Sequence, residues 1–230
     1  MYNILVCDDE KDIVKALTIY LSGENYNIFQ AFNGKEAIQI TEKEKIHLIL
    51  MDVMMPVVDG ITAMTKIREI SNVPVILLTA KSEDTDKILG LNVGADDYIT
   101  KPFNPVEVIA RVKAQLRRYV TLGGDAERAG TDVISVKGIV LDDKAKAVTV
   151  DGEGVNLTPT EYHILRLFLL NPGKVFSPKD IYKMVWEDIP LGSEGTVAVH
   201  IRHLREKIEI NPSEPRYLKV VWGQGYKLEE

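Results

Sequence analysis

The sequence predicts an α/β fold, in which an open, doubly wound parallel sheet of five strands precedes a smaller α+β domain. Two observations predict it. Short apolar runs alternate with amphipathic stretches over residues 1–120, and short strands with capped helices occupy residues 133–230. A chain of 230 residues also has the length of two ordinary domains. We expect a first domain at 1–120, a flexible linker at 121–132 and a second domain at 133–230.

Five apolar runs in the first domain have the length of buried strands. They are Tyr2–Cys7, Tyr26–Ala31, His47–Asp52, Val73–Thr79 and Asp97–Thr100. The stretches between them carry apolar residues at helical spacing, for example Ile13, Leu17, Tyr20 and Leu21. Such alternation favours a parallel sheet with right-handed crossovers and helices on both faces.

The last helix of the first domain is expected to run from Asn104, its cap, to about Tyr119. Pro105 suits its first turn and Glu107 stands three residues after the cap. Residues 121–132 then contain glycines, small residues and charges without periodicity, which is typical of a flexible linker.

The second domain begins with short alternating strands over Ser135–Val155, with turns at 142–143 and 151–152. Three helices should follow. They begin at Thr158, in a capping box with Glu161, at Ser177-Pro178, and at about Glu194, the last running to Ile210. A hairpin over Tyr217–Leu228, turning at 223–225, ends the chain. This order is the layout of a winged helix-turn-helix.

Composition limits the classes of function. A net charge of -6 does not indicate a basic nucleic-acid-binding protein, so any DNA contact must come from a local patch. The single cysteine, Cys7, excludes an internal disulfide and fits a reducing cytoplasm. No apolar run approaches the roughly 20 residues that span a bilayer, and the N-terminus lacks a basic leader. We expect a cytoplasmic protein without a membrane segment.

Polar residues follow four of the predicted strands, at the edge where parallel sheets gather their chemistry. They are Asp8-Asp9, Asp52, Thr79 and Lys101. Three converging carboxylates repel one another unless a cation lies among them, and their hard oxygen atoms suit Mg²⁺. One carboxylate can then attack a phosphoryl group, while the Thr79 hydroxyl and the Lys101 ammonium balance its charge.

Each acidic residue also has a simpler interpretation as a helix cap or a solvated turn. Asp8-Asp9-Glu10 alone could favour the start of the next helix through its dipole. Five matching residues at four strand ends are harder to explain in this way. A phosphate-accepting site is therefore the better interpretation of the set.

Four motifs resemble the receiver domain of two-component response regulators, which has a flavodoxin-like fold. They are CDDE (7–10), MDVMMPVVDG (51–60), LTAK (78–81) and GADDYITKPF (94–103). The resemblance implies that a sensor histidine kinase phosphorylates Asp52. It also implies that Asp9, Asp52 and the Met54 carbonyl bind Mg²⁺ directly, and that Asp8 binds it mainly through water.

The same resemblance assigns roles to the remaining site residues. Lys101 would pair with the phosphoryl group, Thr79 would move to donate a hydrogen bond to it, and Tyr98 would change rotamer with the phosphorylation state. The Lys101–Pro102 peptide would be cis, which an X-Pro bond permits at modest cost.

The predicted helix near the C-terminus has an inward apolar stripe at Val197, Ile201, Leu204 and Ile208. Val199, Arg202, His203 and Glu206 should point outward. Such a helix can lie in a major groove, or can be an ordinary amphipathic surface helix. Its sequence, with LTPTEYHIL (157–165) and GQGY (223–226), resembles the winged-helix regulators of the OmpR/PhoB type.

This second resemblance implies double-stranded promoter DNA and RNA polymerase as partners. The DNA-binding set that it implies is Thr196, Val199, His200, Arg202 and His203, with Arg205 and Lys207 nearer the phosphates. The segment 187–194 would contact RNA polymerase. Residues 217–227 and 113–119 look most like the vancomycin-resistance regulator branch.

The resemblance also implies a homodimer that forms on phosphorylation. Three pairs have the signs that an isologous two-fold interface needs, although a solvated charged face would explain the same residues. The pairs are Lys87 with Glu107, Asp97 with Arg111, and Asp96 with Arg118. Residues 131–230 hold 13 Lys and Arg against 15 Asp and Glu. We therefore expect weak binding by a monomer and stronger binding by a dimer on two half-sites.

Two departures and two rival functions complete the prediction. Gly195 stands where relatives often carry a polar or basic residue, and Trp222 stands where many carry a wing arginine. The Trp222 side chain could pack against sugar edges or against the domain core. A haloacid-dehalogenase-type phosphatase needs an acid two residues after the nucleophile, where this chain has Met54, so we expect no enzyme. A second domain that binds protein instead of DNA is the other alternative.

Overall fold

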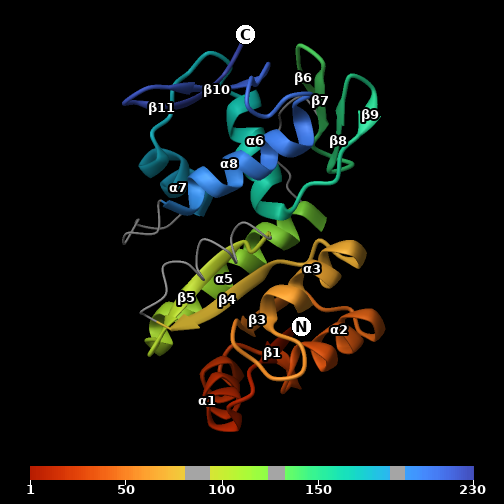
Figure 1. Ribbon diagram of the computed structural model, residues 1–230, viewed down its shortest axis with the longest axis vertical. Helices are drawn as coiled ribbons and strands as arrows, with labels where there is room; N and C mark the ends of the chain where they lie inside the picture. The colour runs from red at the N-terminus through yellow and green to blue at the C-terminus, as the bar shows by residue number, and fades with distance from the viewer. Residues whose placement is uncertain (81–93, 124–132, 187–194) are drawn as a thin grey trace. The chain divides into compact units, whose positions relative to one another are not determined.

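The computed structural model describes residues 1–80, 94–123, 133–186 and 195–230 (Figure 1). Within the range 94–123, side chains are described up to residue 119. The chain divides into two compact units, Met1–Tyr119 and Val120–Glu230. The last helix of the first domain runs to Gly123, past the predicted end near Tyr119, so the linker predicted at 121–132 is wrong for its first three residues. Residues 124–132 lie outside the described part of the chain.

The first unit is built on a sheet of five parallel strands in the order β2-β1-β3-β4-β5. The strands are β1 (Tyr2–Cys7), β2 (Tyr26–Ala31), β3 (Leu48–Asp52), β4 (Val75–Ala80) and β5 (Asp97–Lys101). All five residues of β3 are buried, as expected for a central strand with both faces covered. The predicted fold of this domain is confirmed, with strand ends shifted by at most two residues.

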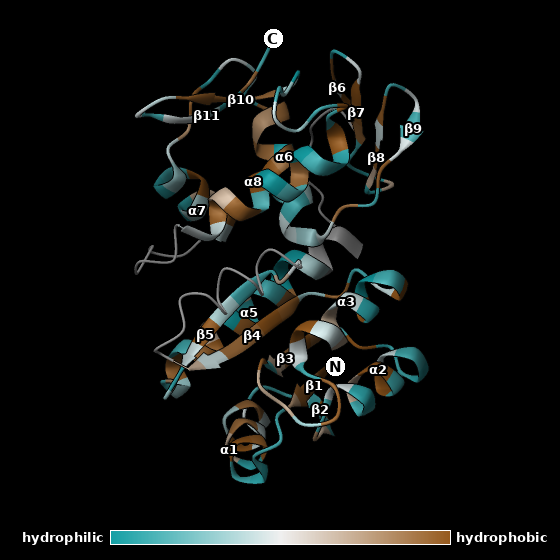
Figure 2. Cartoon of the chain, in the orientation of Figure 1, coloured by the Kyte–Doolittle hydropathy of each residue, from teal (hydrophilic) through white to brown (hydrophobic). Residues whose placement is uncertain are grey.

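Helices cover the sheet of the first unit. They are α1 (Lys11–Ser22), α2 (Gly34–Lys43), α3 (Gly60–Ile70) and α5 (Pro105–Gly123). One core cluster joins Leu17 of α1 and Val112 of α5 to Leu50 of β3. In Figure 2, β4 is hydrophobic along most of its length, whereas α1, α2 and α3 carry both hydrophobic and hydrophilic faces.

The second unit contains a four-stranded antiparallel sheet, three described helices and a terminal hairpin. The sheet consists of β6 (Val133–Val136), β7 (Ile139–Asp142), β8 (Ala147–Val150) and β9 (Glu153–Gly154). The helices are α6 (Pro159–Leu169), α7 (Pro178–Trp186) and α8 (Gly195–Ile208), and the hairpin pairs β10 (Leu218–Val221) with β11 (Gly225–Leu228). This is the predicted winged-helix layout.

Helices α6 and α7 of the second unit begin at the capping residues that the sequence predicted. The Thr158 hydroxyl accepts from the amide of Glu161, and the Glu161 carboxylate accepts from the amide of Thr158, which completes the predicted capping box. At α7, the Ser177 hydroxyl accepts from the amide of Asp180.

Helix α8 ends two residues before the predicted Ile210. The Glu209 carboxylate turns back to accept from the amides of Arg216, Tyr217 and Leu218 at 2.6–2.9 Å. These three hydrogen bonds hold residues 216–218, where β10 begins, against the end of α8.

Further hydrogen bonds attach the terminal hairpin to the rest of its unit. Arg205 of α8 donates from Nε and Nη2 to the carbonyl of Leu218, at 2.8 and 2.6 Å. The backbones of Phe176 and Tyr226 exchange two hydrogen bonds of 2.9 and 3.0 Å. A Cβ at Gly225 would lie 2.0 Å from the Phe176 carbonyl oxygen, so this approach needs glycine.

Candidate functional sites

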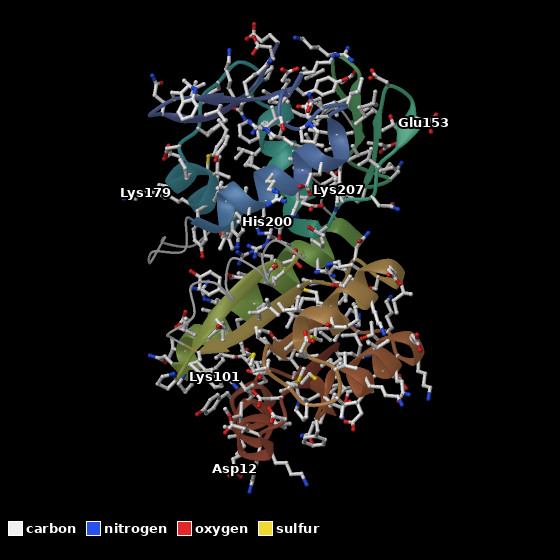
Figure 3. All side chains as sticks on the ribbon, viewed as in Figure 1. Asp12, Lys101, Glu153, Lys179, His200 and Lys207 are labelled. Atoms are coloured by element: carbon white, nitrogen blue, oxygen red, sulfur yellow. The ribbon has the colours of Figure 1, made fainter. Side chains whose placement is uncertain are left out.

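The predicted polar residues of the first unit converge at the carboxyl ends of its strands. A cavity of about 340 Å³ there is lined by Asp9, Asp52, Thr79 and Lys101, with Glu10, Val53, Met54, Leu78 and Ala80. Lys101, which ends β5, is marked in Figure 3. Because the ends of parallel strands meet at one edge of the sheet, residues far apart in the chain share this cavity.

Lys101 joins two of the carboxylates. Its Nζ lies 2.7 Å from Asp52 Oδ1 and 2.8 Å from Asp8 Oδ2, and 3.8 Å from Glu10 Oε1. The other oxygen atoms are held by backbone amides, since Met54 donates to Asp52 Oδ2 and Glu10 donates to Asp8 Oδ1, both at 3.0 Å. Hydrogen bonds therefore orient both buried carboxylates.

The electrostatics of Asp52 are set mainly by burial. Burial raises the pKa of Asp52 to about 6, although the hydrogen bond and charge of Lys101 oppose the rise. Burial alone would lower the pKa of Lys101, but its hydrogen bonds to Asp52 and Asp8 outweigh this and raise it. Lys101 is thus held as an ammonium, while a charge on Asp52 is costly without a further cation.

The donor set fits a divalent cation. Asp8, Asp9 and Asp52 each offer a carboxylate oxygen within 4.8 Å of the others. Lys101 contacts two of these carboxylates, those of Asp8 and Asp52, and brings one positive charge against three negative charges, so two negative charges are left for a metal to balance. Clustered hard oxygen ligands with room for water suit Mg²⁺.

Gly60, which the sequence reasoning missed, positions the acceptor strand. A Cβ on Gly60 would lie 2.0 Å from the carbonyl oxygen of Asp52, and the Gly60 amide donates to Val53. The N-terminus of α3 can approach β3 this closely because residue 60 has no side chain. Its position directly after Asp59, the N-cap of α3, was the signal that could have identified it.

Thr79, Met54 and Tyr98, which were also predicted to belong to the site, differ in their exposure. Thr79 is buried in the cavity wall, and its hydroxyl donates to the Ala80 carbonyl at 3.3 Å. The Met54 side chain is exposed beside the cavity. Tyr98 is half-buried on β5, and its amide donates to Asp97. The Lys101–Pro102 peptide is cis, as predicted.

The residues predicted to pair across a dimer are engaged within the single chain. Asp97 forms a buried ion pair with Arg111 at 2.9 Å, and Glu107 contacts the same guanidinium at 3.0 Å. Asp96 is buried against Arg68, which the sequence reasoning did not identify, at 2.9 Å. Arg118 is also buried, and Lys87 lies outside the described residues. Pairing across a two-fold axis remains a prediction.

Helix α8 has a wider buried side than its apolar stripe predicted. Thr196, His200 and His203 are buried, so the expectation that His203 points outward is wrong for this structure. His200 packs its ring 5.4 Å from that of Trp186 on α7, which accounts for the burial of that flank. The exposed side of α8 carries Arg202, whose Nε contacts Glu206 at 2.9 Å, and Val199 is half-buried.

Two residues that were expected near DNA phosphates have partners inside the second unit. Arg205 holds the Leu218 carbonyl, and Lys207 Nζ contacts the buried Glu161 carboxylate at 2.6 Å. Both side chains therefore connect α8 to other elements of the domain. Helical periodicity predicts which side of α8 a residue lies on, but it does not predict that Arg205 and Lys207 contact acceptors on neighbouring elements.

Gly195 and Trp222, the two residues of the second unit that depart from the family pattern, are both exposed. The Trp222 residue is 91% exposed at the turn of the β10–β11 hairpin, so packing into the domain core is excluded. Gly195 is the first residue of α8. The predicted RNA polymerase segment, 187–194, lies outside the described residues.

None of the helices in the described ranges combines the length and the apolar composition of a membrane span.

Two family models match the chain, one to each unit. The model described as "Response regulator receiver domain" matches residues 4–113, and that described as "Transcriptional regulatory protein, C terminal" matches residues 152–228. Both matches agree with the domains and motifs described above.

Three known proteins illustrate the similarity over the whole chain. The regulatory protein VanR of Enterococcus faecium is 44% identical over 228 residues, which cover 99% of this chain and 98% of VanR. The transcriptional regulatory protein SrrA of Staphylococcus aureus is 43% identical over 228 residues, covering 98% and 95%. The structure of DrrB, described as a Thermotoga maritima OmpR/PhoB homolog, covers both chains fully with 32% identity and a TM-score of 0.51.

Proposed function

We propose a function from the premise that this chain belongs to the OmpR/PhoB family of two-component response regulators. It is a phosphorylation-activated transcription regulator, with a receiver domain and a DNA-binding domain. Since the identities to VanR and SrrA are almost equal, assignment to the vancomycin-resistance branch remains a prediction.

Asp52 is the residue that we propose as phosphoacceptor, with a sensor histidine kinase as donor. The observation that carries this proposal is the bridge from Lys101 Nζ to Asp52 Oδ1 and Asp8 Oδ2, at 2.7 and 2.8 Å. A carboxylate oxygen of Asp52 forms a bond to phosphorus as the P–N bond of a phosphohistidine breaks. The imidazole leaves with the bonding electrons, and Lys101 stays close to the new phosphoryl oxygen atoms.

Asp9, Asp52 and the Met54 carbonyl would hold Mg²⁺, with Asp8 acting through water. The bound ion supplies positive charge that balances the carboxylates and the transferred phosphoryl group. Thr79 has to turn its hydroxyl away from the Ala80 carbonyl to reach a phosphoryl group on Asp52. That reorientation is the proposed first step of the switch, and a change of the Tyr98 rotamer is the second.

The output is proposed to be a homodimer that binds two half-sites of promoter DNA. Exchange of the Asp97–Arg111 pair from within one chain to between two chains would give the two-fold contacts at little electrostatic cost. A second domain with more acidic than basic residues gains affinity from two linked sites. RNA polymerase is proposed as the partner of residues 187–194, and the cytoplasm as the location.

The phosphoryl chemistry is proposed to serve signalling instead of turnover. Two residues after Asp52 stands Met54, whose thioether cannot protonate a leaving group, and whose side chain is largely exposed at the cavity. A phosphatase of the aspartyl-phosphate type needs an acid at this position.

Footprinting on the promoter region of its own gene tests the proposal. Wild type treated with acetyl phosphate should protect paired half-sites about one helical turn apart, more strongly than untreated protein. Asp52→Ala should lose the response, and Asp12→Ala, an exposed acid on α1, should keep it. Identical footprints for Asp52→Ala and phosphorylated wild type would contradict the switch. Absence of binding to any fragment would favour the protein-binding alternative.

A further inference from the structure

His47 stands directly before β3, at the amino edge of the sheet, and the functions proposed above do not use it. Its Nδ1 accepts a hydrogen bond of 3.0 Å from the amide of Asn3, and its own amide donates to the Asn3 carbonyl at 2.9 Å. A backbone amide can donate only to a ring nitrogen that carries no proton. The hydrogen bond from β1 to the ring therefore requires the neutral form of His47.

The imidazole ring of His47 contacts two tyrosine rings from different elements. Its centroid lies 5.6 Å from that of Tyr2 on β1, at an interplanar angle of 65°, and 6.3 Å from that of Tyr119 on α5, at 81°. Among the described residues of α5, Leu116 is the last in the core cluster of the first unit, so Tyr119 attaches the helix beyond the core. His47 thus connects the end of α5 to the amino ends of β1 and β3.

The surroundings of His47 disfavour a positive charge on its ring. Burial removes water from the ring, and Lys45 and the amino group of Met1 repel a further cation, so the pKa of His47 is lowered. The Asn3 carbonyl favours the charged ring but does not outweigh these effects. The other titratable groups against the ring, the two tyrosine hydroxyls, stay neutral near physiological pH. Attraction of an imidazolium to a tyrosine face is small at a half-exposed site.

We propose that His47 is a pH-sensitive clasp, which holds the end of α5 to the sheet while its Nδ1 carries no proton and releases it on protonation. A proton on Nδ1 breaks the hydrogen bond from the Asn3 amide, and the ring then shifts away from Tyr2 and Tyr119. A histidine whose folded pKa is lowered stabilises the folded contacts above its unfolded pKa, near 6.5, and loses this effect as the pH falls through the folded value.

The clasp would connect pH to the output of the protein through α5. This helix carries Glu107, Arg111 and Arg118 of the proposed dimer interface, and the second unit follows it. Release of the helix end should weaken the dimer of the phosphorylated protein, because ordering Arg118, which directly precedes Tyr119, then costs more conformational entropy. This consequence for dimerisation rests on the proposed function, whereas the release of α5 itself does not.

Amide hydrogen exchange of the full-length protein tests the clasp. On acidification from about pH 7.5 to about pH 5.5, and after correction for the intrinsic rate, exchange over residues 116–119 should become about fivefold to tenfold faster, the effect of one lost hydrogen bond. The ring protons of His47 should titrate below the usual histidine value in NMR spectra. His47→Asn offers the Asn3 amide an oxygen that does not take up a proton, so its exchange should not depend on pH.

Two further variants separate the titration of His47 from its packing. His47→Phe keeps a ring but removes the acceptor, so exchange should be fast at both pH values. His163→Asn is the matched control, since His163 contacts the Tyr162 ring in the second unit at 5.7 Å and should leave the response of α5 unchanged. A response that persists in His47→Asn would assign it to another group, such as Asp52 with its pKa of about 6, and overturn the clasp. Equal exchange of wild type at both pH values would also overturn it.

Sedimentation with acetyl phosphate tests the consequence for dimerisation. On the same acidification, wild type should lose about fivefold to tenfold more dimer affinity than His47→Asn. Absence of a phosphorylation-dependent dimer at the higher pH would contradict the proposed function, while hydrogen exchange would still decide the clasp. Faster exchange at the end of α5 with an equal loss of dimer affinity in both proteins would overturn the regulatory role of His47.

Discussion

At the scale of single residues, the acidic cavity combines carboxylates that repel with one lysine that cannot neutralise all of them. Lys101 contacts Asp8 and Asp52 at 2.8 and 2.7 Å, and burial still raises the pKa of Asp52 to about 6. The folded chain therefore holds unfavourable charge at the site where a cation and a phosphoryl group are expected to bind.

Mg²⁺ is expected to stabilise the folded protein through this cluster. Added at a hundred times its dissociation constant, it should raise the free energy of unfolding by about 3 kcal/mol. Asp9→Asn and Asp52→Asn should reduce the gain, since each removes a carboxylate from the cluster. Thermal melting with and without Mg²⁺ measures the effect, and the exposed Asp12→Asn should behave as wild type. An equal gain in all variants would mean that the ion binds elsewhere.

The close approach of Gly60 to Asp52 in β3 can be tested by adding a side chain at residue 60. Gly60→Ala places a Cβ 2.0 Å from the Asp52 carbonyl oxygen, a backbone atom that cannot move aside easily. We expect a loss of roughly 2–3 kcal/mol in the free energy of unfolding, together with slower phosphorylation. Denaturant unfolding measures the first effect. Gly23→Ala, where a Cβ meets nothing within 4 Å, should cost little, and equal stability of both variants would disprove the contact.

At the scale of elements, helices and strands are joined by polar side chains as well as by the core. Asp143, after β7, accepts from Tyr162 and Arg166 of α6 and from Lys146, at 2.6–2.8 Å. Burial alone would raise the pKa of Asp143, but these hydrogen bonds outweigh it and lower the pKa to about 2. One carboxylate thus fastens the antiparallel sheet to α6.

The lowered pKa of Asp143 predicts a pH dependence. A carboxyl whose pKa is lower in the folded state stabilises that state above its unfolded pKa, near 4, and loses the effect as the pH falls to about 2. Asp143→Asn should therefore cost roughly 2 kcal/mol at neutral pH and progressively less in acid. Unfolding curves between pH 7 and pH 2 measure this. Glu153→Gln, an exposed acid on β9, is the control, and a difference independent of pH would contradict the assignment.

At the scale of the whole molecule, the two units have separate cores and are expected to communicate through dimerisation. Two of the acidic residues assigned to the dimer already have a partner within the chain, since Asp97 pairs with Arg111 and Asp96 pairs with Arg68. An interface built from them has to exchange existing pairs, so its strength depends on the difference between two arrangements.

Charge reversal tests this exchange. Arg111→Glu should abolish dimerisation of the phosphorylated protein, because it faces the buried Asp97 with a like charge. The double variant Asp97→Lys, Arg111→Glu should restore dimerisation in part. Sedimentation with a phosphodonor measures both, with circular dichroism as a check of folding. Lys113→Glu, which breaks a partly exposed pair between α5 and Glu24, should dimerise normally. Full dimerisation of Arg111→Glu would refute the interface.

Much of the fold follows from local sequence. The five strands were predicted to within two residues at their ends, because apolar runs alternate with helical spacing and each run is long enough to be a buried strand. The capping box at Thr158 is equally local. The outward side of α8 was predicted less well, since periodicity locates the apolar stripe but not the ring of Trp186, which packs on its flank.

The shared site of Asp8, Asp9, Asp52, Thr79 and Lys101 could be predicted from the order of the apolar runs alone, because parallel strands bring their carboxyl ends to the same edge. The acceptors that the long side chains contact could be seen only in the folded chain. Arg68 reaches Asp96 across 28 positions, and Lys207 reaches Glu161 across 46. The tertiary structure also showed that Trp222 lies outside the core. Such contacts depend on where folded elements meet, and no local period encodes that meeting point.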